Sequence, residues 1–283
     1  MMIETFVFFD IETTGLPQFE KNRTKITELT FIAVARKDIE TSECLPLMNK
    51  LSLLFNPERK IQKEASRITG LTNNNLKNQP IFKDKTQTIN TFLLELNQPV
   101  CLVAHNGNRF DFKVLRAEFC EAGQDLPSHL LCLDSLTGFR KIAKDSMYIC
   151  SRVPSSASKN ITIKTIHNRE TNITTSLKVD DLLTDDDDDD WPQLNTSTEI
   201  WEKIDKLSIN ECPANKPRTT EKVSCQLTAL YKRLLKKEPL TSHRAEADCI
   251  MLLECVTTTK QSFLPWADKN CKLISEVKPL IRS

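Results

Sequence analysis

Hydrophobic and polar positions along the first 150 residues fall into blocks that predict strands and helices in turn. Short apolar runs, typical of strands inside a sheet, occupy Thr5–Phe9, Ile26–Arg36, Lys50–Phe55, Val100–Ala104 and Leu130–Asp134. Other segments, some with apolar residues at helical spacing, predict helices over Ile61–Ile68, Gln87–Leu96 and Phe112–Ala122. This alternation predicts a three-layer α/β fold.

The pattern stops at about residue 150, where Ser, Thr, Asn and Asp become dominant. Such a segment buries too little apolar surface to offset its chain entropy. Helical spacing returns over Cys225–Leu235 and His243–Val256, which are too short to fold alone. We therefore expect residues 1–149 and 223–283 to form one domain, interrupted by a long disordered acidic insertion at 150–222. In the tail, Phe263–Trp266 is expected to dock on the surface.

Composition narrows the class of protein. With 5 glycines and 39% hydrophobic residues, the chain is neither collagen-like nor of low complexity. No apolar run approaches the roughly 18 residues of a membrane span, and the first residues do not resemble a signal peptide. Ten cysteines without a CxxC pair indicate free thiols in a reducing compartment. We expect a soluble intracellular protein of the cytoplasm or nucleus.

Charge is distributed unevenly along the chain. The net charge is +1, but eight aspartates lie between Asp180 and Asp190, so the rest of the chain carries +9. A mildly basic body suits a polyanionic partner. The simplest interpretation of the aspartate run is a solvated loop.

Two acidic residues end the first predicted strand. Asp10 and Glu12 share a face because side chains alternate along a strand. Two carboxylates after an apolar run repel each other, and a hard cation such as Mg²⁺ relieves that repulsion. Taken alone, the pattern is more typical of a solvated strand end. The apolar run before it and the Thr-Thr-Gly turn after it favour a metal site.

Two further patterns carry acidic residues. Asp111 follows a strand and an Asn-Gly loop and opens a helix, as a metal ligand or only as an N-cap. In a regular helix His243 and Asp248 would point about 140° apart. They can share a site only if His243 lies at or before the helix start, on a mobile loop. Glu246 is a competing acid, whose simpler role is a solvent-facing carboxylate.

In this order, Asp10, Glu12, Asp111, His243 and Asp248 resemble the motifs of the DEDD superfamily of 3′→5′ exonucleases, in its histidine-bearing branch. The segments Phe9–Pro17, Ile68–Leu71 and Val103–Phe112 are similar to the three-prime repair exonuclease (TREX) family of animals. The resemblance covers about residues 3–145 and 222–270. It implies a ribonuclease-H-like mixed sheet flanked by helices.

The resemblance also implies a chemistry, which is release of mononucleotides from DNA 3′ ends by two-metal phosphodiester hydrolysis. Asp10 is expected to bridge two Mg²⁺ ions, with Mn²⁺ able to replace them. Glu12 and Asp248 would complete one metal site, and Asp111 would support the other. His243 is expected to act as the general base.

Substrate contacts are implied in the same way. Leu16 and Ile68 are expected to wedge against the terminal bases, the alternative being ordinary core positions. Arg109 is expected to contact a phosphate, with the Phe110 ring beside it. The full set of expected substrate contacts is Glu12, Thr13, Leu16, Ile68, His105, Asn106, Arg109, Phe110 and Asp248.

The expected partners are DNA 3′ ends, single-stranded ends in preference, and a second copy of the chain. Lys50–Phe55 predicts an exposed edge strand suited to a homodimer, unless it is an interior strand. The alternatives are an RNA exonuclease, since 2′-OH contacts are not visible in a sequence, and a non-catalytic nucleic-acid-binding protein. The intact acids argue against the second.

The insertion departs from the family, in which a shorter loop precedes the third motif. We expect residues 172–210 to be dispensable for hydrolysis. Besides a solvated loop, the aspartate run has two other interpretations, an internal mimic of DNA and a weak Mg²⁺ buffer.

Overall fold

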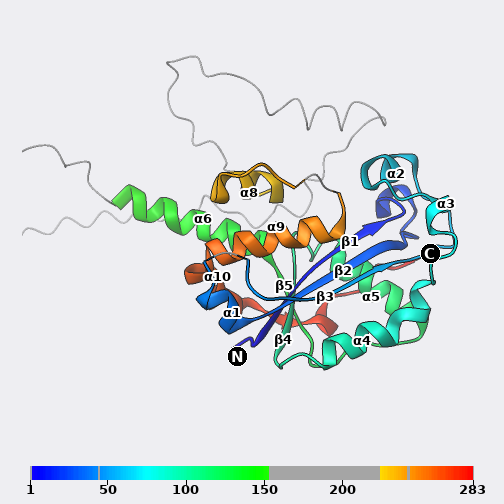
Figure 1. Cartoon of the computed structure of the whole chain (residues 1–283), viewed down its shortest axis with the longest axis horizontal. Helices are drawn as coiled ribbons and strands as arrows, with labels where there is room; N and C mark the ends of the chain where they lie inside the picture. The colour runs from blue at the N-terminus through cyan, green and yellow to red at the C-terminus, as the bar shows by residue number, and fades with distance from the viewer. Residues whose placement is uncertain (1, 44, 153–223, 241–242, 283) are drawn as a thin grey trace, which may run out of the picture. The chain divides into compact units, whose positions relative to one another are not determined.

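Six strands form one mixed sheet in the order β3-β2-β1-β4-β5-β6 (Figure 1). The computed structural model describes residues 2–43, 45–152, 224–240 and 243–282, which belong to one compact unit. The strands are β1 (Thr5–Thr13), β2 (Ile26–Ala35), β3 (Asn49–Leu54), β4 (Val100–Ala104), β5 (Leu131–Asp134) and β6 (Lys272–Leu273). β1 pairs antiparallel with β2 and parallel with β4, so the two strands beside it run in opposite directions.

Strand β1 is buried on both faces, which explains its nearly continuous apolar sequence. Phe6 and Phe8 point into one hydrophobic cluster, and Val7, Phe9 and Ile11 point into a second cluster on the opposite face. Side chains alternate along a strand, so a strand covered on both sides needs apolar residues at successive positions. Asp10 and Glu12 interrupt this run on the face of Phe6 and Phe8.

Helices cover both faces of the sheet. The described helices are α1 (Arg36–Thr41), α2 (Lys63–Thr69), α3 (Asn73–Leu76), α4 (Thr86–Leu94), α5 (Asp111–Ala122), α6 (Ser135–Arg152), α8 (Leu227–Leu235), α9 (Ala245–Thr258) and α10 (Lys260–Asn270). Helix α9 packs on β1 and β2, with α8 against its other side (Figure 1). Residues of α4 and α5 belong to the cluster on the opposite face. This arrangement confirms the predicted three-layer α/β fold.

The predicted strands match the observed ones to within a few residues, and β3 lies at the sheet edge, so its interpretation as an interior strand is wrong. The prediction that Phe263–Trp266 docks on the surface is also wrong. Helix α10 places Phe263 and Leu264 in the core, where Phe263 packs against Phe139 of α6 at 5.2 Å between ring centroids. This packing requires α6, which the sequence analysis did not predict.

The expectations for residues 150–222 lie almost wholly outside the described residues. Helix α6 continues to Arg152 and so includes the first three residues of the predicted insertion. The disorder of the insertion and the roles of its aspartates therefore remain predictions. No helix in the described part of the chain is both long enough and apolar enough to cross a membrane.

Candidate active site

Three carboxylates from two elements meet near the C-terminal end of β1. Asp10 and Glu12 come from the strand, and Asp248 comes from the beginning of α9, which packs on that strand. One carboxylate oxygen of each residue lies within 4.8 Å of the other two. All three residues are partly buried and keep some access to solvent. The predicted first and third motifs therefore meet in space.

The fourth predicted acid is connected to the first motif through the backbone. Asp111 is only 5% exposed and is the first residue of α5. The N-cap position falls on Phe110, so the interpretation of Asp111 as only an N-cap is wrong. Burial raises the pKa of Asp111, and a hydrogen bond that its carboxylate accepts from the backbone N–H of Ile11 partly offsets this rise. Ile11 stands between Asp10 and Glu12, so this bond ties the start of α5 to the acidic end of β1.

Burial and mutual repulsion raise the pKa of all four carboxyl groups. Desolvation is the largest cause in each case, and the negative charges of neighbouring acids add to it. The pKa of Asp10 is raised well above its usual value. The raised pKa is about 9 for Glu12, about 7 for Asp111 and about 6 for Asp248. At neutral pH such a group of acids either retains protons or needs a positive ion.

The cluster fits a divalent metal ion. Its three close ligand atoms are all carboxylate oxygens, the type that hard cations such as Mg²⁺ and Ca²⁺ prefer. The positive charge of Arg244 lowers the pKa of Glu12, but it does not cancel the effects of burial and of the neighbouring acids, which raise this pKa. An added double positive charge would resolve the electrostatic conflict, with Asp10, Glu12 and Asp248 as its ligands.

His243 lies immediately before α9, which begins at Ala245. The backbone of His243 has φ of +67°, a left-handed conformation that is uncommon for residues other than glycine. The histidine is solvent-exposed. The requirement that it precede the helix start is thus met, while a contact with the acids is not recorded among the described residues. Its catalytic role remains a prediction.

The sequence analysis missed two residues that organise the site, Glu28 and Asp134. Glu28 on β2 lies directly opposite Glu12 in the β1–β2 register and is 3% exposed. Arg244 donates two hydrogen bonds to it, from Nε to Oε2 at 2.8 Å and from Nη2 to Oε1 at 2.7 Å. The available signal was a charged residue within the apolar run of β2, but its importance depends on a strand register that the sequence does not give.

The loop between β4 and α5 is organised by Asp134, a second residue that the sequence analysis missed. Its carboxylate accepts hydrogen bonds from the backbone N–H groups of Asn106 at 2.9 Å and Asn108 at 3.0 Å. Gly107 is required between them, because a Cβ there would lie 2.6 Å from Ala104 and 2.7 Å from Phe112. The loop that leads to Asp111 is therefore held in one conformation by β5.

The ring of His105 is engaged within the fold. Nε2 donates to the carbonyl of Cys225 at 2.9 Å, and Nδ1 lies 2.9 Å from Oγ of Ser135. Burial lowers the pKa of this histidine, which favours the neutral ring. A substrate contact by His105, as expected from the sequence, would have to replace one of these hydrogen bonds. Of its predicted neighbours, Arg109 is exposed and Phe110 is partly buried.

Leu16 and Ile68 are both partly exposed and belong to none of the hydrophobic clusters of the described residues. Their alternative interpretation as ordinary core positions is therefore wrong. Leu16 follows a buried turn in which the hydroxyl of Thr13 donates to the carbonyl of Gly15 at 3.1 Å. This turn directly follows Glu12, so Leu16 is presented next to the acidic end of β1.

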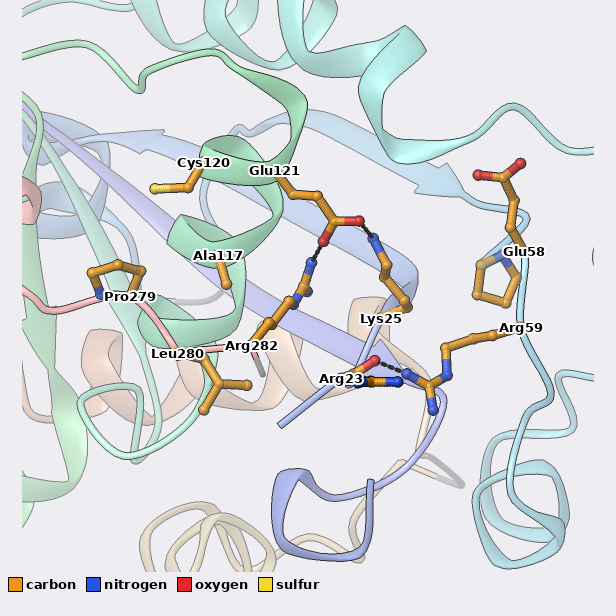
Figure 2. Close-up of a pocket in the computed structure, with 11 residues that line it drawn as sticks. Arg23, Lys25, Glu58, Arg59, Ala117, Cys120, Glu121, Pro279, Leu280 and Arg282 are labelled. Atoms are coloured by element: carbon orange, nitrogen blue, oxygen red, sulfur yellow. Dashed lines mark hydrogen bonds and ion pairs between the residues drawn. The ribbon is translucent and has the colours of Figure 1, made fainter. Parts of the chain in front are cut away.

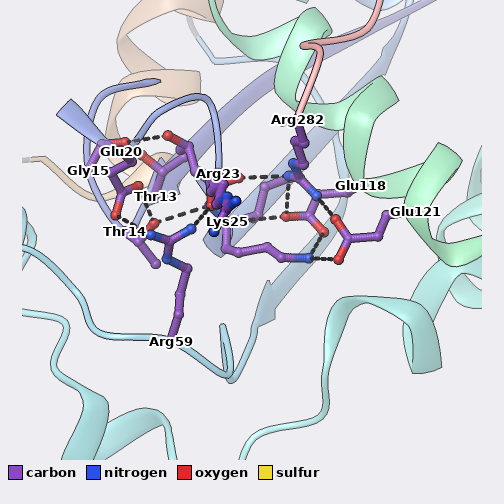
Figure 3. A network of polar contacts seen from close by, with 12 residues as sticks. Thr13, Thr14, Gly15, Glu20, Arg23, Lys25, Arg59, Glu118, Glu121 and Arg282 are labelled. Carbon is purple, nitrogen blue, oxygen red and sulfur yellow. Dashed lines mark hydrogen bonds and ion pairs between the residues drawn. The ribbon is translucent and has the colours of Figure 1, made fainter. Parts of the chain in front are cut away.

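A network of polar contacts holds the chain after this turn (Figure 3). Thr14 donates its hydroxyl hydrogen to buried Glu20 at 2.6 Å, and Glu20 lies 3.5 Å from Arg59. Farther along, Lys25 and Arg282 both form ion pairs with Glu118 and Glu121 of α5. The network connects the loop that carries Leu16 to α5, whose first residue is Asp111.

A cavity of about 700 Å³ lies on the outer side of this network (Figure 2). Its charged lining residues are Arg23, Lys25, Glu58, Arg59, Glu121 and Arg282, and none of the four site acids lines it. Lys25 and Arg282 form ion pairs with Glu121 of this lining and with Glu118 beside it. The lining has more basic than acidic residues, but it lacks the carboxylates that the predicted metal chemistry requires, so we place the active site at the carboxylate cluster.

The raised pKa values predict how the metal-free protein responds to pH. A carboxyl group with a pKa raised by folding binds protons more tightly when folded, so its contribution to stability falls as pH rises from about 4 to its folded pKa. For Asp248 that loss is nearly complete at pH 8, because its folded pKa is about 6. We expect Asp248→Asn to increase the free energy of unfolding by about 1–3 kcal/mol at pH 8.

The measurement is urea denaturation in EDTA at pH 5 and pH 8. The gain should shrink toward pH 5, where Asp248 is largely protonated. Saturating Mg²⁺ should reverse the order, because it stabilises only the parent fully. A variant that is less stable than the parent in EDTA at pH 8 would contradict the repulsion between these acids.

Comparisons with known proteins agree with this geometry. Residues 7–167 match the sequence profile of the Exonuclease family (RNase_T). Three prime repair exonuclease 2 of Homo sapiens is 40% identical over 148 residues, which are 48% of this chain and 61% of that protein. The Mus musculus protein of the same name is 27% identical over 98% of this chain and 92% of its own length. Three-prime repair exonuclease 1 of Homo sapiens is 28% identical over 98% of this chain and 71% of its own.

Among solved structures, E. coli exonuclease I in complex with a dT13 oligonucleotide matches the fold. Its TM-score is 0.52 at 16% identity, over 94% of this chain and 43% of that chain. A second exonuclease I structure gives a TM-score of 0.53 over the same shares. At this identity the match concerns the fold alone, and the chain spans less than half of exonuclease I. The expected exonuclease fold and the resemblance to the three-prime repair exonucleases are confirmed.

Proposed function

Because the chain belongs to the Exonuclease (RNase_T) family, we propose that it hydrolyses DNA from the 3′ end and releases mononucleotides. The observation that carries this proposal is the meeting of Asp10, Glu12 and Asp248 within 4.8 Å. A buried cluster of acids is costly for the fold, as the raised pKa values indicate. Its presence at the end of a covered strand is understandable if it binds cations for catalysis.

In this proposal each residue of the site has a distinct role. Asp10, Glu12 and Asp248 hold divalent ions, which we propose to be two Mg²⁺, and Asp111 supports them from the start of α5. When bound, these ions supply positive charge that stabilises the scissile phosphate. His243, on the loop before α9, takes the proton from the attacking water. An exposed histidine is suited to that transfer, because the imidazole is the most frequent general base among side chains.

We propose a single-stranded 3′ end as the preferred substrate. Leu16 and Ile68 are partly exposed near-surface aliphatic residues, and stacking against such groups does not depend on base sequence. Arg109, in the loop two residues before α5, is exposed and can meet a phosphate. The relatives named three prime repair exonuclease support DNA over RNA as the substrate.

Paired degradation assays test the proposal. We expect the protein to shorten a 5′-labelled DNA oligonucleotide from its 3′ end in Mg²⁺ and to lose this activity in EDTA. A matched RNA oligonucleotide should be degraded at least about tenfold more slowly, since a 2′-OH changes fit at the reacting nucleotide. Faster loss of RNA would favour the RNA exonuclease alternative. Binding of DNA without any cleavage, in Mg²⁺ or Mn²⁺, would favour a non-catalytic protein.

We also propose that two copies pair through β3. This strand lies at the edge of the sheet and pairs with β2 on one side. Its outer edge carries unpaired backbone groups, which are a template for another strand. Sedimentation at micromolar concentration should give a mass near twice 32.4 kDa. A mass near 32.4 kDa would contradict the dimer.

The compartment that we propose is the cytoplasm or the nucleus. Seven cysteines of the described residues have free thiols, five of them buried. Burial raises the pKa of Cys101 and Cys249, so these thiols stay protonated and unreactive. Free thiols of this kind are typical of reducing compartments.

A further inference from the structure

A buried acid stands beside the catalytic cluster without belonging to it. Glu28 faces Glu12 across the β1–β2 ladder, and side chains at such paired positions lie on the same face of the sheet. Its exposure is 3%, so its charge needs a partner inside the protein. The negative charge of Glu28 also contributes to the raised pKa values of Glu12 and Asp248.

That partner is Arg244, and the contact has the two-bond geometry that only a guanidinium provides. Nε and Nη2 of Arg244 each donate to a different oxygen of Glu28, at 2.8 and 2.7 Å. The backbone N–H of Ala245 points at the same carboxylate, at 3.4 Å from Oε2. A carboxylate at the N-terminus of a helix is favoured by the helix dipole. Glu28 therefore binds both the side chain and the backbone at the start of α9.

Arg244 also begins the helix that carries the third motif. It is the N-cap residue of α9, and its carbonyl accepts hydrogen bonds from Ala247 at 2.9 Å and Asp248 at 3.3 Å. His243 is the residue before it. One residue fixed to β2 thus stands between the predicted general base and a metal ligand, and β2 is held in register with the strand that carries Asp10 and Glu12.

We propose that Arg244 and Glu28 are a positioning pair, which fixes the start of α9 so that His243 and Asp248 are aligned with the carboxylates of β1. This inference rests on the proposed function and deepens it. The pair touches neither the substrate nor a metal ion. Its effect on hydrolysis passes through the residues on either side of Arg244.

Two other roles for Arg244 make different predictions. Its side chain is 48% exposed, so it could instead bind a substrate phosphate, and its loss would then raise KM with little change in kcat. It could also act only by charge. In that case removal of the Arg244 charge would strengthen metal binding, because the negative charge of Glu28 would then be uncompensated beside the acids. Lysine, which carries the same charge, would replace Arg244 fully.

The experiment compares Arg244→Gln, Arg244→Lys, Glu28→Gln and the double variant Glu28→Gln/Arg244→Gln with the parent. We expect each single variant except Arg244→Lys to lower kcat about 10- to 100-fold at saturating Mg²⁺ and DNA, with KM within about threefold, because small misplacements of catalytic groups cost rate. Arg244→Lys should restore only part of kcat, since an ammonium cannot bridge both oxygens. The kcat of the double variant should be no lower than that of the less active of the two Gln single variants, because the pair acts as a unit.

A second measurement does not depend on activity. The rise in the midpoint of thermal unfolding on adding saturating Mg²⁺ should be smaller in Arg244→Gln than in the parent, because Asp248 is no longer aligned. Lys237→Gln is the matched control. It removes an ion pair of 2.7 Å to Glu254 of the same helix α9, and the Lys237 side chain is exposed. It should leave both kcat and the Mg²⁺ effect within about twofold of the parent.

Three results would overturn the positioning role. These are an increase of KM alone, losses that add in the double variant, and a larger Mg²⁺ effect in Arg244→Gln. If Arg244→Gln does not fold, Arg244→Lys and Glu28→Gln carry the same comparison. A parent protein that cannot degrade DNA would contradict the proposed function instead, and the Mg²⁺ effect on unfolding would still test the pair.

Discussion

Replacing Asp10 with Asn should lower kcat by more than about a thousandfold, a loss of at least about 4 kcal/mol of transition-state stabilisation. Burial raises the pKa of Asp10, and the charges of Asp111, Asp248 and Glu12 raise it further. An amide of the same size removes the charge that binds a cation but keeps the shape of the site. The measurement is single-turnover hydrolysis of a labelled single-stranded DNA oligonucleotide in Mg²⁺.

The variant should still fold and bind DNA, and in EDTA it should unfold no earlier than the parent because one repelling charge is gone. Asp125→Asn is the matched control, since it makes the same chemical change at an exposed position. Hydrolysis by Asp10→Asn at the parent rate would show that the acids do not form the catalytic centre. Loss of activity in Asp125→Asn would instead point to a general effect of the substitution.

His243→Ala should lower kcat by about 10²–10⁴-fold even at saturating Mg²⁺, the usual contribution of a general acid–base group. The histidine is exposed on the loop before α9 and is not among the three residues whose ligand atoms converge. Its removal should therefore change the chemical step and leave metal binding intact. Mg²⁺ titrations of both kcat and thermal unfolding separate these two effects.

His129→Ala is the control for this prediction, because His129 is an exposed histidine on the loop before β5. A loss smaller than about fivefold in His243→Ala would remove His243 from the mechanism. A normal kcat recovered by raising Mg²⁺ would assign it to metal binding instead.

The sequence predicts the sheet well because the signal is local. Strand β1 is apolar on both faces, and its two acids, Asp10 and Glu12, share a face because side chains alternate along a strand. The position of His243 follows from helix geometry in the same way, since five residues of helix cannot bring it to the side of Asp248. In the structure α9 begins at Ala245, so His243 precedes the helix as this geometry requires.

The parts that could not be predicted depend on contacts distant in sequence. Glu28 matters because of its register with Glu12 and its contact with Arg244, 216 residues away. The sequence analysis places Phe263 at the surface, whereas its partner Phe139 is on a helix that the sequence analysis did not identify. Asp134 is similar, since its role is to bind backbone groups of another loop.

The order of the elements along the chain has a consequence for synthesis on the ribosome. Asp10, Glu12 and Asp111 are made early, but Asp248 and the helix that covers Phe6 and Phe8 are made more than 130 residues later. A nascent chain that has emerged as far as residue 222 therefore has an open apolar face and an incomplete set of acids. Because the proposed hydrolysis needs Asp248, the chain cannot carry it out before α9 is synthesised, and until then the side of the sheet that α9 covers exposes apolar residues that favour aggregation.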